Sequence, residues 1–203
     1  MTEWFEDFKT YLPKYLSAEA QTKLFTELNQ FPKNIDSRVY TQRLKNEPIL
    51  FQGDGLPSLW VADLPNQTIR QTRVMVLSNT CDVAPDNKHL LGPRLLYCPI
   101  ISLSKLESLL LKTNLQAGFD LQGYLTVIRS QQNSSMFYLP KNDILGEEAI
   151  ALLDRINNCD AQTLIIQDVL KGRLFTLSDY GFYLFLFKLS LHLTRIREGV
   201  ARN

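Results

Sequence analysis

The sequence predicts an α+β fold, in which a small β-barrel or curled sheet lies between helices at the two ends of the chain. Apolar residues recur at helical spacing before residue 32 and after residue 178. Between these regions, short apolar runs alternate with turns that contain glycine, proline or asparagine. The 203 residues are 45% hydrophobic, which is enough to bury one core, so we expect a single domain over 1–203.

An N-terminal helical extension is expected over residues 1–32. The first helix carries one apolar face and ends at Pro13. That face consists of Trp4, Phe8, Tyr11 and Leu12. Ser17 has the residue type of an N-cap, and it predicts a second helix that ends before Pro32. The apolar stripe of this helix consists of Ala20, Leu24, Leu28 and Phe31.

Four strands are predicted in the first half of the central region, which spans 48–160. They cover residues 48–52, 58–64, 70–78 and 94–102. The residues at 53–57 and 65–67 are typical of turns. The second half of the 70–78 run is apolar on both faces, which is typical of a central strand. Pro99 lacks an N–H group, so it predicts a bulge or an edge within 94–102.

A helical insertion is expected over residues 103–131. Ser104 and Glu107 have the spacing of a capping box and predict a helix whose inward residues are Leu103, Leu106 and Leu110. A second helix is expected over 119–131, although Gly123 weakens it.

Two further strands and a long helix are expected after the insertion. Residues 135–140 read as a strand, and residues 147–156 fit either state but are taken as a strand. Ser178 is the expected N-cap of a helix over 180–197, within a C-terminal segment of 178–202. Its alternating pattern also fits a strand, but the run is longer than most strands.

Charge, cysteines and hydropathy exclude several classes of protein. The net charge is +1, so nucleic-acid binding would need a local basic patch. Three irregularly spaced cysteines and two histidines give no zinc spacing, and they favour a reducing cytoplasm and no metal or other cofactor. The apolar run at 180–193 is too short for a membrane span, and the acidic N-terminus does not resemble an export signal.

The segment LSNTCD at residues 77–82 turns polar directly after an apolar strand. Cys81 with Asp82 and His89 suggests a thiol nucleophile, but a small buried cysteine is the simpler interpretation, and His89 fits a solvated loop. Asp82 suits a turn that binds its own backbone N–H groups or, alternatively, a binding site. Asn79 can read a nucleobase, because its amide both donates and accepts hydrogen bonds.

Five segments follow one another in the order found in the PemK/MazF toxin family. They are Gly53-Asp54, LWVADLP at 59–65, RVMVLSN at 73–79, LLYCPIIS at 95–102 and AIALLDRINNCD at 149–160. On these segments the chain resembles that family over about residues 49–160. The resemblance implies an SH3-like β-barrel.

The resemblance also implies a metal-independent, sequence-specific endoribonuclease that acts as a toxin or in a conflict system. Family members carry an arginine before the VLSN strand and a threonine or serine at the end of the next strand. Here those positions hold Thr72 and Ile101, so the catalytic candidates are Arg73, Arg70 and Ser102. A one-residue shift on a strand reverses the side chain, so both departures weaken the catalytic analogy.

The nucleic-acid-binding candidates lie at the ends of the predicted strands. They are Ser78, Asn79, Asp82 and Arg94. The aromatic residues that could stack bases are Trp60, Tyr97 and Tyr138. The implied partners are RNA, an antitoxin or another protein, and a second copy of the chain. The alternative is an inactive module that binds nucleic acid or protein on the same barrel.

Overall fold

The structure is a computed structural model that describes residues 17–84, 86–87, 92–113, 118–163 and 166–194. The chain divides into two compact units, residues 1–31 and 32–203. The first unit contains helix α2 (Ala18–Asn29), whose first turn is capped by Ser17 Oγ, which accepts a hydrogen bond from Ala20 N at 3.2 Å. The predicted cap is therefore confirmed. The helix expected around Trp4 lies outside the described residues.

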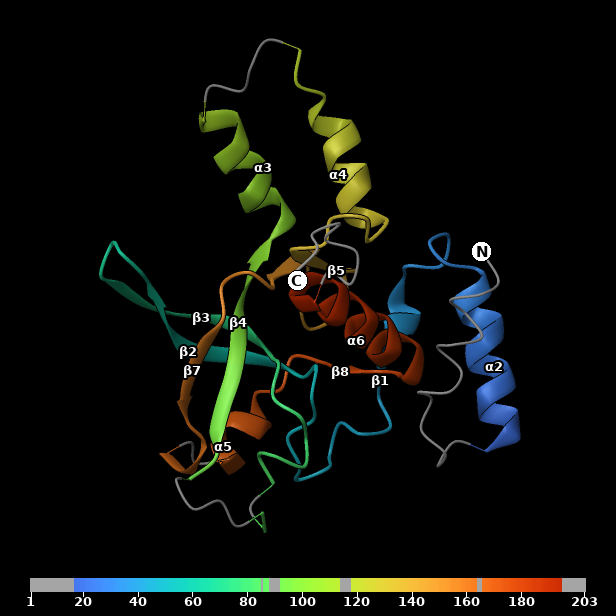
Figure 1. Cartoon of the computed structure of the whole chain (residues 1–203), viewed down its shortest axis with the longest axis vertical. Helices are drawn as coiled ribbons and strands as arrows, with labels where there is room; N and C mark the ends of the chain where they lie inside the picture. Colours follow the sequence, from blue (N-terminus) through green and yellow to red (C-terminus); the bar gives the residue numbers. More distant parts are fainter. Residues whose placement is uncertain (1–16, 85, 88–91, 114–117, 164–165, 195–203) are drawn as a thin grey trace, which may run out of the picture. The chain divides into compact units, whose positions relative to one another are not determined.

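The second unit is a mixed α+β structure built on a six-stranded antiparallel sheet, which confirms the predicted class (Figure 1). The strand order is β2-β3-β4-β6-β5, and β7 also pairs with β4. The strands are β2 (Gly55–Asp63), β3 (Thr68–Val76), β4 (Arg94–Ser102), β5 (Met136–Leu139), β6 (Ala149–Leu152) and β7 (Asn157–Asp160). The ladders formed by the described residues do not close this sheet into a barrel.

Strand β4 lies at the centre of the sheet and has the bounds that the sequence predicts. One edge pairs with β3, and the other pairs first with β7 and then with β6. Between the pairs Tyr97↔Asn157 and Ile100↔Ala151, the facing chain has five residues, 152–156, against two in β4. Pro99 is one of these two residues, so the predicted irregularity lies where β4 changes partner.

Residues 48–52 do not form the predicted strand. Backbone carbonyl groups in and beside this segment bond to a side chain and not to a neighbouring strand. The carbonyl groups of Glu47 and Ile49 accept hydrogen bonds from the Arg173 guanidinium. The sequence also did not predict the short paired strands β1 (Tyr40–Thr41) and β8 (Thr176–Leu177), or the separation of β7 from β6.

The insertion forms the two predicted helices, α3 (Leu103–Lys112) and α4 (Leu121–Arg129), which lie side by side in Figure 1. Leu106 of α3 and Ile128 of α4 share a buried core with Ile150 of β6. The N-cap of α3 is Ser102 and not Ser104, because Ser102 Oγ accepts the Lys105 N–H at 3.2 Å. Strand β4 therefore leads directly into α3.

Helix α6 (Asp179–Thr194) confirms the predicted C-terminal helix and its cap, since Ser178 Oγ accepts the Gly181 N–H at 3.1 Å. Gly181 allows close approach to the 3₁₀ turn η1 (Ser37–Val39). A Cβ atom at residue 181 would lie 2.1 Å from the carbonyl oxygen of Val39. The remaining elements are η2 (Ala161–Thr163) and α5 (Ile166–Lys171).

Within the described residues, no helix has both the length and the apolar character needed to cross a membrane.

Candidate nucleic-acid site at the end of strand β4

Arg73 lies on β3 opposite a β-bulge. Leu56 pairs with Val74 and Leu59 pairs with Thr72, so two residues of β2, Pro57 and Ser58, face the single residue Arg73. A bulge of this kind bends the strand and redirects nearby side chains, and bulges are frequent beside active sites. The bulge therefore gives Arg73 a strand geometry that differs from that of the regularly paired residues of β3.

The Arg73 guanidinium makes two long contacts with the loop that precedes β6. Its Nη2 lies 3.4 Å from Glu147 Oε1, and its Nη1 donates to the Leu145 carbonyl oxygen at 3.5 Å. The side chains of Arg73 and Glu147 are 41% and 42% exposed. Such an exposed, long pair is weakly coupled, so either group can turn toward a ligand.

Ser102 is linked to Arg73 and Glu147 through the hydroxyl group of Ser104. Ser104 Oγ lies 3.0 Å from Ser102 Oγ and 3.5 Å from Glu147 Oε2. We call Arg73, Ser102, Ser104 and Glu147 the Arg73 cluster. The structure thus brings together two of the three predicted catalytic residues. It adds Glu147 and Ser104, which the sequence did not predict as site residues, although Glu147-Glu148 is a carboxylate pair at the start of a predicted strand.

The adjacent Glu148 is held much more firmly than Glu147. Arg129 Nε and Nη2 donate to its two carboxylate oxygens at 2.9 and 2.8 Å, and the Tyr138 hydroxyl is a third partner. These hydrogen bonds lower the pKa of Glu148, with Arg129 as the largest cause, and burial raises the pKa of Tyr138. Glu148 is therefore a structural anion that anchors α4 to the sheet, whereas Glu147 is available for chemistry.

One face of the β2–β3 hairpin carries an exposed aromatic residue beside Arg73. Trp60 pairs with Gln71, so both lie on the face that Arg73 shares by strand alternation. Trp60 is 59% exposed, whereas Tyr97 and Tyr138 are buried. Of the three predicted stacking residues, Trp60 is the one that a base could reach.

Arg70 does not join the Arg73 cluster. It lies three residues before Arg73 on the same strand, and an odd separation places the two side chains on opposite faces. Arg70 pairs with Val61, whose side chain belongs to the buried core of the other face. Of the two arginines predicted as catalytic candidates, Arg73 is therefore the one whose position allows it to act with Ser102 and Glu147.

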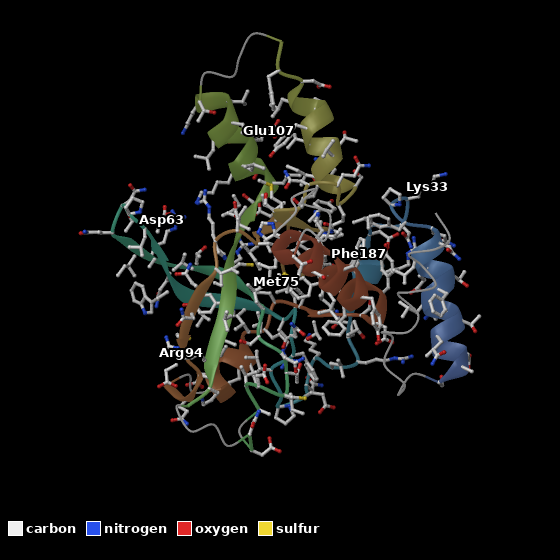
Figure 2. All side chains as sticks on the ribbon, in the orientation of Figure 1. Lys33, Asp63, Met75, Arg94, Glu107 and Phe187 are labelled. Carbon is white, nitrogen blue, oxygen red and sulfur yellow. The ribbon has the colours of Figure 1, made fainter. Side chains whose placement is uncertain are left out.

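Ser78 and Arg94 lie at the other end of β4. Ser78 is buried, and its Oγ donates to the Arg94 carbonyl at 3.2 Å and accepts the Leu96 N–H at 2.8 Å. Arg94 contacts the side chain of Asn158. Eight residue steps of a strand separate Arg94 from Ser102, up to about 26 Å. Figure 2 accordingly shows Arg94 far from Glu107 of α3. Ser78 has a structural role here, which argues against the predicted base contact.

The turn after β3 is organised by Asn79. Its Oδ1 accepts the Cys81 N–H at 2.9 Å, and its carbonyl accepts the Asp82 N–H at 3.1 Å. This is the turn-forming role that the sequence suggested for the Asp82 carboxylate. Cys81 is exposed, so the expectation of a buried cysteine is wrong. His89 lies outside the described residues.

The two family positions that depart from the toxin pattern have structural roles in this chain. Ile101 pairs with Ile150 and packs against the core that α3 and α4 cover. Thr72 pairs with Leu59 on the opposite face of β3 from Arg73. These contacts leave both side chains outside the Arg73 cluster.

No group of three or more metal-ligating side chains forms within the described ranges. Neither models of known protein families nor curated proteins match this sequence.

Proposed function

We propose that this protein is a PemK/MazF-like, metal-independent endoribonuclease that acts on RNA in the cytoplasm, as a toxin or in a conflict system. The observation that carries the proposal is the Arg73 cluster. It combines a guanidinium, a carboxylate and two hydroxyl groups within contacts of 3.0 to 3.5 Å. RNA cleavage through the 2′-hydroxyl needs these chemical types: a base, an acid and a positive group.

We also propose that β2, β3, β4 and β7 correspond to an SH3-like barrel. Strand β7 approaches the free edge of β2, because Asn157 Oδ1 accepts the Ala62 N–H at 2.8 Å. Leu59 and Val61 of β2 share a core with Leu95 of β4 and with Ala161, which follows β7. These contacts support a strongly curled sheet whose first and last strands are joined by a side chain.

In the proposed reaction, Glu147 takes the proton from the 2′-hydroxyl as its oxygen forms a bond to phosphorus. Arg73 stabilises the negative charge that develops on the phosphoryl oxygens. The bond from phosphorus to the 5′-oxygen then breaks. That oxygen receives a proton from Ser104, which recovers one from Glu147 across their 3.5 Å contact. Ser102 orients Ser104, and Trp60 offers a face on which a flanking base can stack.

Variants of the Arg73 cluster should lose RNA cleavage while remaining folded. We expect Glu147→Gln to lower kcat by about 10²- to 10⁴-fold through loss of the base. We expect Arg73→Ala to lower it by about 10²- to 10³-fold through loss of charge stabilisation. Single-turnover cleavage of a labelled RNA measures both effects. Arg70→Ala is the matched control, since it removes an exposed arginine from the opposite face. Equal losses for Arg70→Ala and Arg73→Ala would contradict these roles.

The second candidate is an inactive module that binds RNA, an antitoxin, another protein or a second copy of the chain. The contact between Arg73 and Glu147 favours it, because a nearby carboxylate weakens the attraction of an arginine for phosphate. This candidate predicts RNA that binds but stays intact. Binding should then fall for Arg73→Ala and rise for Glu147→Gln, which removes the competing charge.

A further inference from the structure

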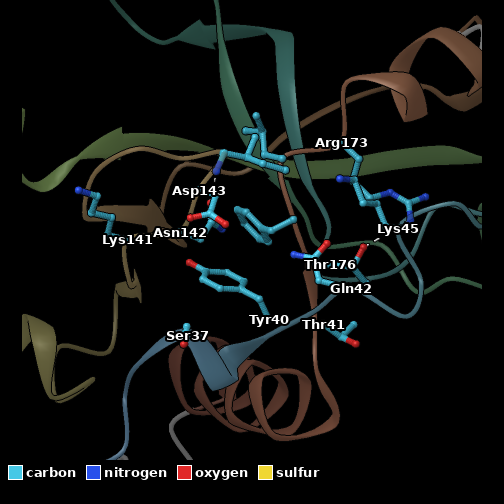
Figure 3. Close-up of a pocket in the computed structure, with 13 residues that line it drawn as sticks. Ser37, Tyr40, Thr41, Gln42, Lys45, Lys141, Asn142, Asp143, Arg173 and Thr176 are labelled. Carbon is cyan, nitrogen blue, oxygen red and sulfur yellow. Dashed lines mark hydrogen bonds between the residues drawn. The ribbon is translucent and has the colours of Figure 1, made fainter.

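A cavity of about 420 Å³ lies in the second unit, and none of its lining residues belongs to the Arg73 cluster. Its walls come from three segments that are distant in the sequence, residues 37–45, 141–144 and 173–176 (Figure 3). Pockets for small molecules and cofactors commonly have volumes of about 300 to 1,000 Å³. The cavity is therefore large enough for a small organic ligand.

The charged lining favours a ligand with negative charge. Lys45 and Lys141 are exposed, and neither forms an ion pair with a described residue. Asp143 is the carboxylate of the lining, and the charge of Arg173 is matched by the buried Asp54. The lining thus has a net positive charge. Figure 3 shows Lys45 and Lys141 on opposite sides of the Tyr40 ring.

The uncharged lining suits a planar ring with polar edges. Tyr40 and Phe175 form an aromatic pair with centroids 5.1 Å apart, and the Tyr40 hydroxyl is fixed by donating to the Pro140 carbonyl at 2.8 Å. Gln42 supplies an amide that can both donate to and accept from a nucleobase. Asn142 offers its Nδ2 as a donor, because its Oδ1 accepts the N–H groups of Ile144 and Leu145 at 2.9 and 2.7 Å. Aromatic faces with nearby amides are the usual means by which proteins hold an unstacked base.

We propose that this cavity binds a nucleoside monophosphate unit, with the base against Tyr40 and Phe175 and phosphate at the lysines. The unit is either a free nucleotide or one residue of a single RNA strand. The two sources differ in their use of the lysines. A free monophosphate has one phosphate and needs one lysine, whereas a strand carries phosphates on both sides of the base and needs Lys45 and Lys141 together.

The test is calorimetric titration of the full chain with uridine and adenosine 5′-monophosphate, with inorganic phosphate as a reference. A short single-stranded RNA is titrated into the Arg73→Ala variant, so that binding at the Arg73 cluster is weakened. For a free nucleotide, we expect one of the two substitutions, Lys45→Gln or Lys141→Gln, to weaken binding about tenfold and the other to leave the affinity unchanged. The affinity of the nucleotide should also fall as salt is added. For an RNA strand, we expect both substitutions to weaken binding.

Lys112→Gln, on the exposed end of α3, is the matched control and should leave both affinities unchanged. All three lysines are exposed, so these variants should fold normally. Two outcomes would overturn the proposal. In the first, neither nucleotide nor RNA affinity responds to Lys45→Gln or Lys141→Gln. In the second, inorganic phosphate binds as tightly as the nucleotides, which would leave no role for the base. Cleavage activity is not needed for either readout, so failure of the endonuclease proposal would not affect this result.

Discussion

Replacing Arg173 by methionine is expected to lower the free energy of unfolding by about 3–5 kcal/mol, because Asp54 then remains as an unpaired buried charge. The two side chains are 3% and 0% exposed, and Arg173 Nε lies 3.3 Å from Asp54 Oδ2. The guanidinium also donates to the carbonyl groups of Leu44, Glu47 and Ile49, which the variant leaves without this donor. Urea denaturation at pH 7 measures the loss.

Lys171→Met is the matched control for Arg173→Met, because it removes a cation two residues earlier that is 77% exposed. We expect it to change the free energy of unfolding by less than about 0.5 kcal/mol. Burial raises the pKa of Asp54 from 3.8 to about 6, so protonation favours the folded chain. The contribution of Asp54 to stability therefore falls as pH rises from about 4 to about 6. Because Asp54 can be protonated at pH 5, the free energy of unfolding that Arg173→Met loses should be smaller at pH 5 than at pH 7. Equal losses in the two methionine variants would show that the ion pair does not hold the fold.

The protein is expected to become more stable between pH 7 and pH 9 because of Lys188 in α6. Its Nζ donates to the main-chain oxygen and the Oε1 of Gln131, both at 2.8 Å. Burial lowers the pKa of Lys188 from 10.5 to about 7. Between these values the unfolded chain keeps a proton that the folded chain has lost, so stability rises with pH by up to about 1.4 kcal/mol per unit.

Denaturation curves at pH 7, 8 and 9 measure this slope, and Lys188→Met should flatten it. The window ends at pH 9 because burial raises the pKa of the Cys98 and Cys159 thiols, whose ionisation in the unfolded chain increasingly opposes the trend as the pH approaches 9. Lys112→Met, an exposed lysine of α3, should retain the slope. An unchanged slope in Lys188→Met would assign the pH dependence to other groups.

Local patterns predicted the elements whose signals lie within a few residues. The bounds of β4 follow from an apolar run with a polar turn on one side and a serine-capped helix on the other. The sequence favours Ser104 over Ser102 as the cap, since two serines two residues apart give similar signals. The end of the β4 ladder at Ser102 decides between them, and pairing with β6 sets that end.

The candidate site was only partly predictable, because its contacts join residues that are distant in the sequence. Glu147 lies 74 residues from Arg73, and no sequence pattern near either residue predicts that their side chains meet. The sequence predicts Ser78 as an exposed turn residue. In the structure its hydroxyl donates to the Arg94 carbonyl and accepts the Leu96 N–H, and both residues belong to a strand that begins 16 residues later. The sequence around Asp54 predicts only a turn, whereas the buried partner of Asp54 is Arg173, which lies in the segment before β8.

Incubation of a labelled RNA with the purified protein in the presence of a chelator tests the endonuclease proposal most directly. We expect fragments that end in a 2′,3′-cyclic phosphate, and no cleavage where a 2′-deoxynucleotide replaces the nucleotide at the cut. Wild-type protein that binds this RNA and leaves it intact would contradict the catalytic roles of Arg73 and Glu147.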